Sequence, residues 1–266
     1  MSGKGTAVYV ALMIHMVPFL LLTLAASPAL AGASAWYKTD GGGVRLVTSQ
    51  VAGDRVKAAL EIELKPGWKT YWRDPGDAGI APSVSVPGAV VEIDYPVPRR
   101  FSDGVSSFAG YEQRGVLPLT IVGAPAQFEA NAFLGICREI CIPVAASLEV
   151  DASRATAAER GIVEAAFSSV PGPVDEDELQ ADVTIDGKTV TLATNVPARE
   201  EANAQLFVAA PSGWAFSPPK AAASHGRLSF AFDIVWKPET AETKGRTVPY
   251  VIVIDDVGKA GSFVLP

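Results

Sequence analysis

Cysteine, methionine and histidine are scarce in this sequence. The 266 residues hold two cysteines, three methionines and two histidines. All the methionines and one histidine fall in the first sixteen residues, so the rest of the chain has a single histidine, His225, and no methionine. A structural zinc site needs four ligands, and two thiols with one distant imidazole do not supply them.

A basic surface is also lacking. The chain carries 22 Lys and Arg against 29 Asp and Glu, a formal net charge of −7. Because nucleic-acid binding relies on Lys and Arg that neutralise phosphates, this balance argues against a nucleic-acid partner. No long apolar run follows the first thirty residues, so we expect no membrane span after them.

Residues 1–31 have the composition of an export signal. Lys4 precedes the apolar stretch AVYVALMIHMVPFLLLTLAA, and small residues follow in SPALAGASA. We predict a signal peptide with cleavage after Ala31, and cleavage after Ala33 or Ala35 would also fit the small-residue rule. The alternative is an uncleaved anchor, since about 18 apolar residues just span a membrane, although Pro18 weakens such a helix. No cysteine lies before Cys137, which excludes a lipid anchor at the cleavage site.

The next part of the chain alternates as β-strands do. In VKAALEIEL, Leu60 and Ile62 are expected to face a core. Glu61 and Glu63 alternate with them and are expected to face solvent, as in an antiparallel sheet with one solvated side. Further strands are predicted around residues 84–86, 90–95, 116–122, 127–136 and 144–150. Gly and Pro separate these strands, so we predict a β-sandwich.

The pattern becomes helical after residue 150. Thr156 and Glu159 have the spacing of a capping box, and apolar residues follow at helical spacing until PGP. We predict one helix over roughly 156–169, followed by the acidic linker VDEDEL. Strand patterns then return in ADVTID, TVTLATN, AQLFVAA, RLSFAFDIVW, VPYVIVIDD and GSFVLP. This half lacks a chemical motif, so we predict a supporting or docking role for it.

The sequence therefore predicts an all-β protein of two β-sandwich units joined by a short helix. The predicted boundaries are residues 1–31 for the signal peptide, 36–150 for the unit with both cysteines, 151–179 for the helix and linker, and 180–266 for the second unit.

The two cysteines lie close together in GICREICIP, residues 135–143. Such a pair forms a structural disulfide, binds a metal ion or acts as a redox pair. A disulfide across about five residues removes unfolded-state entropy worth roughly 2 kcal/mol, which a domain of more than about 100 residues hardly needs. A structural disulfide remains an alternative, because exported proteins do carry such disulfides.

Copper binding and nucleophilic catalysis are two other uses of cysteine. Copper(I) suits soft thiolates, but a thioredoxin-like copper chaperone would place this motif where a strand turns into a helix. Here Cys141 is followed by IPVAASLEVD, which alternates as a strand does. A cysteine nucleophile needs a histidine base, and after the signal only His225, in the turn-like stretch ASHGR, is available.

Three stretches in order carry a family resemblance: LKPGWKTYWRDPGDAGIAPSV (64–84), FAGYEQRGVLPLTI (108–121) and FLGICREICIPVAASLEV (133–150). Together they resemble the N-terminal periplasmic domain of the thiol:disulfide interchange protein DsbD, and within that family its ScsB-like branch. The resemblance spans roughly residues 36–170 and is expected to extend into the C-terminal half. Full-length members continue into a transmembrane domain and a terminal thioredoxin-like domain, and this sequence holds neither.

The resemblance implies an immunoglobulin-like sandwich in which Cys137 and Cys141 are the catalytic redox pair. In the family this domain takes electrons from a membrane-embedded domain and passes them to periplasmic oxidoreductases. Carried over, the chain is a periplasmic thiol–disulfide oxidoreductase of the protein-disulfide reductase type. Its implied partners are thioredoxin-like proteins and a membrane-embedded electron donor, and no cofactor is implied. The competing class is a non-catalytic protein-binding module with a structural disulfide.

The resemblance also implies different roles for the two cysteines. The second, Cys141, is expected to join a partner in a mixed disulfide. Pro143 limits strand pairing and should hold Cys141 near a sheet edge. The Cα atoms of the pair are expected to be about 4.4–6.8 Å apart. The better-known branch of the family spaces its cysteines more widely, so the geometry of that site is not carried over.

Other side chains near the motif have predictions of their own. Arg138 would favour a thiolate and Glu139 would oppose it, although both are also ordinary residues of a turn. By analogy with the family, Phe108 and Tyr111 are predicted to cover the cysteine pair. The aromatic residues of GWKTYW are expected to pack in the core and in turns.

Overall fold

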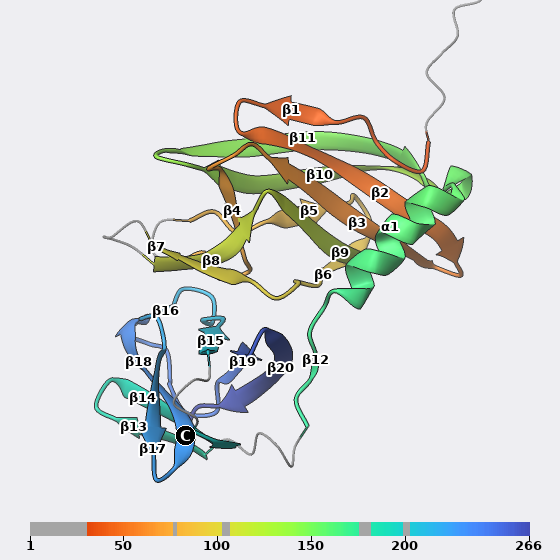
Figure 1. Ribbon diagram of the computed structural model, residues 1–266. Coiled ribbons are helices and arrows are strands. Elements are labelled where there is room, and N and C mark those ends of the chain that lie inside the picture. Colours follow the sequence, from red (N-terminus) through yellow and green to blue (C-terminus); the bar gives the residue numbers. More distant parts are fainter. Residues whose placement is uncertain (1–30, 77–78, 103–106, 176–181, 199–202) are drawn as a thin grey trace, which may run out of the picture.

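A computed structural model describes residues 31–76, 79–102, 107–175, 182–198 and 203–266. All but the last residue of the predicted signal peptide therefore lie outside the described residues. The described chain forms two β-sandwiches connected by one α-helix (Figure 1). The predicted all-β fold class with a short connecting helix is confirmed. No helix within these ranges is long and apolar enough to cross a membrane.

The first sandwich consists of two antiparallel sheets. One sheet has the order β1 (Tyr37–Thr39), β2 (Gly42–Ala52), β3 (Arg55–Leu64), β9 (Arg114–Val122), β6 (Val90–Ile93). The other has the order β11 (Cys141–Asp151), β10 (Gln127–Cys137), β4 (Lys69–Tyr71), β8 (Ser107–Glu112), β7 (Arg99–Ser102), with β5 (Ser83–Ser85) also pairing with β10.

Alternate side chains of these strands fill the space between the two sheets. Leu60 and Ile62 of β3 are fully buried, as predicted, and so are Leu134 and Ile136 of β10. Full burial of such a side chain stabilises a fold by about 1.5–3 kcal/mol relative to exposure. Period-two patterning thus fixes which face of each strand points inward.

The helix α1 (Ala157–Ser168) covers the outer face of the first sheet, across β2, β3 and β9 (Figure 1). The predicted capping box is present: the Thr156 hydroxyl accepts from the Glu159 N–H, and the Glu159 carboxylate accepts from the Thr156 N–H. Val163 and Ala166 are buried against the sheet. The helix therefore lies within the range predicted from the sequence.

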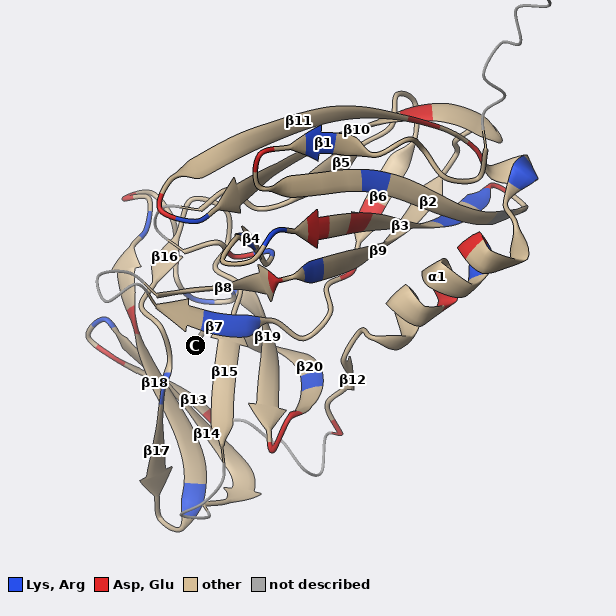
Figure 2. Ribbon diagram, turned by 45° about the horizontal axis from the view of Figure 1, so that its top comes forward, with Lys and Arg blue, Asp and Glu red and all other residues tan. Residues whose placement is uncertain are grey.

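The prediction that both glutamates of β3 face solvent is wrong for Glu61. Its carboxylate is buried, with Arg45 Nη2 at 2.6 Å and Arg114 Nη2 on the other oxygen. These arginines lie on the two neighbouring strands, so acidic positions of β3 lie between basic positions of β2 and β9 (Figure 2). A buried carboxylate needs such partners, because burying an unpaired charge is costly.

The second sandwich also has two sheets. One has the order β12 (Gly172–Pro173), β20 (Val257–Val264), β19 (Thr247–Ile254), β15 (Ala204–Val208). The other has the order β13 (Asp182–Asp186), β14 (Thr189–Pro197), β18 (Arg227–Trp236), β16 (Ala215–Phe216), with β17 (Lys220–Ser224) also pairing with β18.

The two sandwiches share apolar contacts. Phe207, Ala209 and Val251 of the second sandwich belong to the core cluster of the first. The Phe207 ring packs edge-on against Trp72, with ring centroids 6.2 Å apart. The end of the second sandwich that carries β15 and β16 therefore lies against the first, near β7 and β8 (Figure 1).

Candidate functional site

The two cysteines close a β-hairpin. β10 and β11 pair along their whole length, and Cys137 and Cys141 are the last partners before the turn of residues 138–140. The two sulfurs form a disulfide, with the Cα atoms 4.1 Å apart, just below the expected range. The setting is an antiparallel hairpin, whereas the copper alternative required a strand that turns into a helix.

The two sulfur-bearing residues differ in exposure. Cys137 is only 6% exposed, because β10 has β11 on one side and β4 on the other. Cys141 is exposed, since it begins β11, which lies at the edge of its sheet. Pro143 lies two residues further along this edge strand, where its missing N–H is tolerated. An incoming thiol would therefore reach Cys141 more readily than Cys137.

Strand β4 brings two polar side chains to the face that carries the disulfide. Lys69 is the cross-strand partner of Cys137, and Tyr71 lies on the same face two residues later. The Tyr71 Oη lies 3.2 Å from Cys141 Sγ. A disulfide sulfur has no proton, so the tyrosine hydroxyl is the donor in this contact. Gly79 and Gly135 leave room for the Tyr71 ring beside the hairpin.

Three aromatic rings extend from the disulfide across this face. The Tyr71 and Phe108 centroids are 5.3 Å apart, and Phe108 stacks on Phe101 at 5.5 Å. The Lys69 ammonium lies 4.7 Å from the Phe101 centroid and 5.6 Å from that of Phe108. We call Tyr71, Phe101 and Phe108 the aromatic wall. It forms an apolar flank on one side of Cys141.

Of the two residues predicted to cover the pair, only Phe108 lies on the face of the disulfide. Tyr111 comes three positions later on β8, so its side chain points to the opposite face and into the core. Its hydroxyl donates to the Pro96 carbonyl at 2.9 Å. Burial, together with the nearby Tyr95, raises the pKa of Tyr111 well above its ordinary value.

The charged residues of the hairpin turn face outward. The Arg138 guanidinium lies 5.7 Å from the Trp68 ring centroid, and its Nη2 is 3.9 Å from the Glu139 carboxylate. Both side chains are well exposed. These contacts are typical of ordinary turn residues, the simpler of the two interpretations made from the sequence.

The contact of Tyr71 with the disulfide was not predicted from the sequence. The aromatic residues of GWKTYW were expected to pack in the core and in turns, which describes the fully buried Trp72 but not the hydroxyl of Tyr71. The available signal was the alternation K-T-Y-W. In a strand, that spacing places Lys69 and Tyr71 on one face and Thr70 and Trp72 on the other.

His225 lies in the second sandwich. It occupies the two-residue turn between β17 and β18, with φ +52° followed by φ +75° at Gly226. Its Nδ1 is 3.1 Å from the Ser224 hydroxyl, and the side chain is exposed. The turn conformation predicted for it is present. Within the described residues, no three His, Cys, Asp or Glu side chains gather where they could hold a metal ion.

Comparison with known proteins identifies relatives of the first sandwich. Residues 44–152 match the family model described as thiol:disulfide interchange protein DsbD, N-terminal. The resemblance seen in the sequence is thereby confirmed, and the match supports a thiol–disulfide exchange domain with a cysteine pair. No curated protein matches the sequence.

Among solved structures, the chain is similar to the N-terminal periplasmic domain of ScsB from Proteus mirabilis. The two share 23% sequence identity with a TM-score of 0.77, over 88% of this chain and 98% of that one. The similarity in fold therefore covers both sandwiches of this chain. The GAE domain of GGA2p from Saccharomyces cerevisiae aligns with 10% identity and a TM-score of 0.32, over 44% of this chain and 96% of that one.

Proposed function

We propose that the protein exchanges disulfides with thioredoxin-like partners in the periplasm, through a Cys137–Cys141 pair that cycles between disulfide and dithiol. The observation that carries the proposal is the asymmetry of the pair. Cys141 is exposed at a sheet edge beside the Tyr71 hydroxyl, whereas Cys137 is buried behind it. A purely structural disulfide has no need of one exposed cysteine with a hydrogen-bond donor beside its sulfur.

In the direction that reduces the pair, a partner thiolate attacks Cys141 Sγ. The bond between the two cysteine sulfurs breaks, its electron pair stays on Cys137, and Cys141 is joined to the partner. The second partner thiol, as thiolate, then attacks the partner sulfur of this mixed disulfide and releases Cys141. The partner leaves as a disulfide, and the pair becomes a dithiol that has gained two electrons and two protons.

In the opposite direction, the Cys141 thiolate attacks a partner disulfide and Cys137 then resolves the mixed disulfide. The 4.1 Å Cα separation keeps Cys137 within reach for this second step. The Tyr71 hydroxyl donates to the thiolate of Cys141 and favours the charged form. The direction of net electron flow follows from the potentials of the donor and the acceptor.

Exposed apolar side chains near the hairpin suit the docking of a partner. Ile140 in the turn is 73% exposed, and Phe133, on the face of Cys137, is 44% exposed. Thiol exchange requires the partner sulfur to approach Cys141 closely, and apolar contacts of this kind hold two proteins together during that step.

We further propose the boundaries 1–31, 36–150, 151–179 and 180–266 as signal peptide, exchange unit, connection and second unit. A membrane-embedded protein is proposed as the electron donor.

Trapping of mixed disulfides tests the roles of the two cysteines. Cys137→Ser leaves Cys141 without its resolving partner, so it should accumulate an adduct with a thioredoxin-like protein during expression in the periplasm. Cys141→Ser should trap little, because the remaining sulfur is buried. Non-reducing electrophoresis with mass spectrometry of the adducts reads the result. Adducts only with Cys141→Ser would reverse the roles, and adducts with neither variant would favour a structural disulfide.

A further inference from the structure

One contact between the sandwiches lies at the far end of the aromatic wall. Arg100 on β7 donates from Nη2 to the Leu206 carbonyl of β15, at 2.8 Å. Its guanidinium also lies 4.8 Å from the centroid of the Phe207 ring. Burial lowers the pKa of Arg100 from its ordinary value, since the charged form loses water at this site. Arg100 is adjacent in sequence to Phe101 of the aromatic wall.

A second contact ties the segment after β4 to the second sandwich. The Asp74 carboxylate accepts from the Ala210 N–H of the second sandwich at 2.7 Å, and from the Gly76 N–H at 3.0 Å. Gly76 has φ +69°, and a Cβ built on it would be 3.4 Å from the Ser107 carbonyl oxygen and 3.9 Å from Phe108 Cβ. The Asp74 turn thus links the second sandwich to the strand that carries Phe108.

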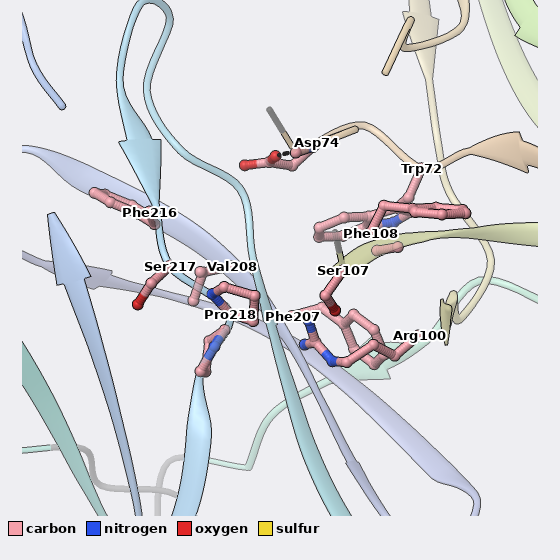
Figure 3. Close-up of a pocket in the computed structure, with 13 residues that line it drawn as sticks. Trp72, Asp74, Arg100, Ser107, Phe108, Phe207, Val208, Phe216, Ser217 and Pro218 are labelled. Atoms are coloured by element: carbon pink, nitrogen blue, oxygen red, sulfur yellow. Dashed lines mark hydrogen bonds between the residues drawn. The ribbon is translucent and has the colours of Figure 1, made fainter. Parts of the chain in front are cut away.

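A cavity of about 60 Å³ separates the two contacts (Figure 3). Its walls come from both sandwiches and include Trp72, Arg100, Phe108, Phe207, Phe216 and Pro218. Phe108 therefore borders the second sandwich through this cavity, and it packs on Tyr71 within the aromatic wall. Tyr71 in turn contacts the sulfur of Cys141.

We propose that the second sandwich positions the aromatic wall against Cys141, with Arg100 and Asp74 as positioning residues. The inference rests on the proposed exchange function and adds a positioning role for the second unit. Closely packed side chains transmit small displacements to their neighbours. Loosening either contact lets Phe108 and Tyr71 shift, weakens the hydrogen bond to Cys141 and lowers its thiolate fraction at neutral pH.

Alkylation of Cys141 in the full chain measures this effect. With Cys137→Ser as background, the iodoacetamide rate constant is followed against pH. Arg100→Met should raise the midpoint of the pH profile. A rise of one pH unit slows alkylation at pH 7 only about threefold, because the tenfold loss of thiolate is partly offset by its greater nucleophilicity. The matched control is Arg99→Met, which removes the neighbouring exposed positive charge, paired with Glu112 on β8, and measures how far the midpoint moves through loss of charge alone.

A double variant at Arg100 and Tyr71 distinguishes positioning of the aromatic wall by Arg100 from general destabilisation of the fold. Tyr71→Phe removes the hydroxyl that contacts Cys141, and should itself raise the midpoint. If Arg100 acts through that hydroxyl, adding Arg100→Met to Tyr71→Phe should move the midpoint no further. The charged side chains around the pair, Lys69, Arg138 and Glu139, together with Glu112 opposite Lys69 on β8, are the same in every variant. An additive shift would show that Arg100 acts by another route and would overturn the proposal.

Asp74→Ala provides a second, independent variant if Arg100→Met does not fold. It should raise the midpoint in the same direction, and circular dichroism confirms that the fold is intact. If folded Arg100→Met and Asp74→Ala proteins both match the Arg99→Met control, the second sandwich does not position the wall. That outcome leaves the exchange function untouched, because trapping by Cys141 is measured separately with the positioning residues intact.

Discussion

At the scale of single residues, two tyrosines on paired strands have opposite surroundings. Tyr71 lies on β4 and Tyr111 lies on β8. These two strands pair with each other, and Thr70 is the residue of β4 that stands opposite Tyr111. Because strand side chains alternate between faces, the Tyr71 hydroxyl contacts the disulfide while the Tyr111 hydroxyl donates to the Pro96 carbonyl. The register between the two strands thus determines which phenol can influence the sulfur chemistry.

Tyr111→Phe tests this assignment and its pH dependence. Below about pH 10, Tyr111 is protonated in both the folded and the unfolded chain. Above that pH the unfolded chain releases the proton while the folded chain, whose pKa is raised, retains it, so the free energy of unfolding falls as pH rises. Tyr111→Phe should flatten this alkaline loss in urea titrations and leave Cys141 alkylation unchanged. A changed alkylation rate would place Tyr111 at the site after all.

Part of the site could be predicted from single residues and part could not. The cysteine pair could be identified from the local sequence, and the edge position of Cys141 could be predicted from Pro143. The contact with Tyr71 depends on the pairing of β4 with β10, which joins Thr70 to the Gly135 carbonyl across 65 positions of the chain. Local periodicity carries no information on which distant strands become neighbours.

At the scale of elements, local patterns located the long strands and the helix but not the short strands β4, β7 and β8, which no predicted strand included. The strands on both sides of the disulfide and the helix at Thr156 lie where alternation and the capping box predicted them. Glu61 is the exception, because its burial results from Arg45 and Arg114 on neighbouring strands. The alternation of polar and apolar residues is the same whether a glutamate is exposed to solvent or is buried between two arginines, so the sequence pattern could not distinguish the two.

Thr156→Ala tests the independence of the helix from the site. The substitution removes the hydroxyl that accepts from the Glu159 N–H and should lower the free energy of unfolding by about 1 kcal/mol. Because α1 packs on the first sheet and the disulfide lies on the outer face of the second, the redox potential should not change. Urea denaturation and a glutathione titration of the same variant check both expectations. A shifted potential would show that the helix influences the disulfide through the sandwich.

At the scale of the whole molecule, the two sandwiches are joined by more than the helix and linker. Phe207 of β15 contributes to the core of the first sandwich, and Arg100 and Asp74 bond to backbone groups of the second. The sequence predicted a supporting or docking unit but could not locate its contacts, since AQLFVAA reads as an ordinary strand. The structure places those contacts next to the aromatic wall.

The redox potential of the Cys137–Cys141 pair tests the central claim most directly. The full chain is equilibrated in glutathione buffers and, for lower potentials, dithiothreitol buffers, and the free thiols are counted by alkylation and mass spectrometry. A variant with both cysteines replaced by serine sets the background. An exchange pair should be half-reduced at a potential clearly less negative than about −300 mV, because it must accept and release electrons. A midpoint below about −300 mV would identify a structural disulfide and contradict the proposed function.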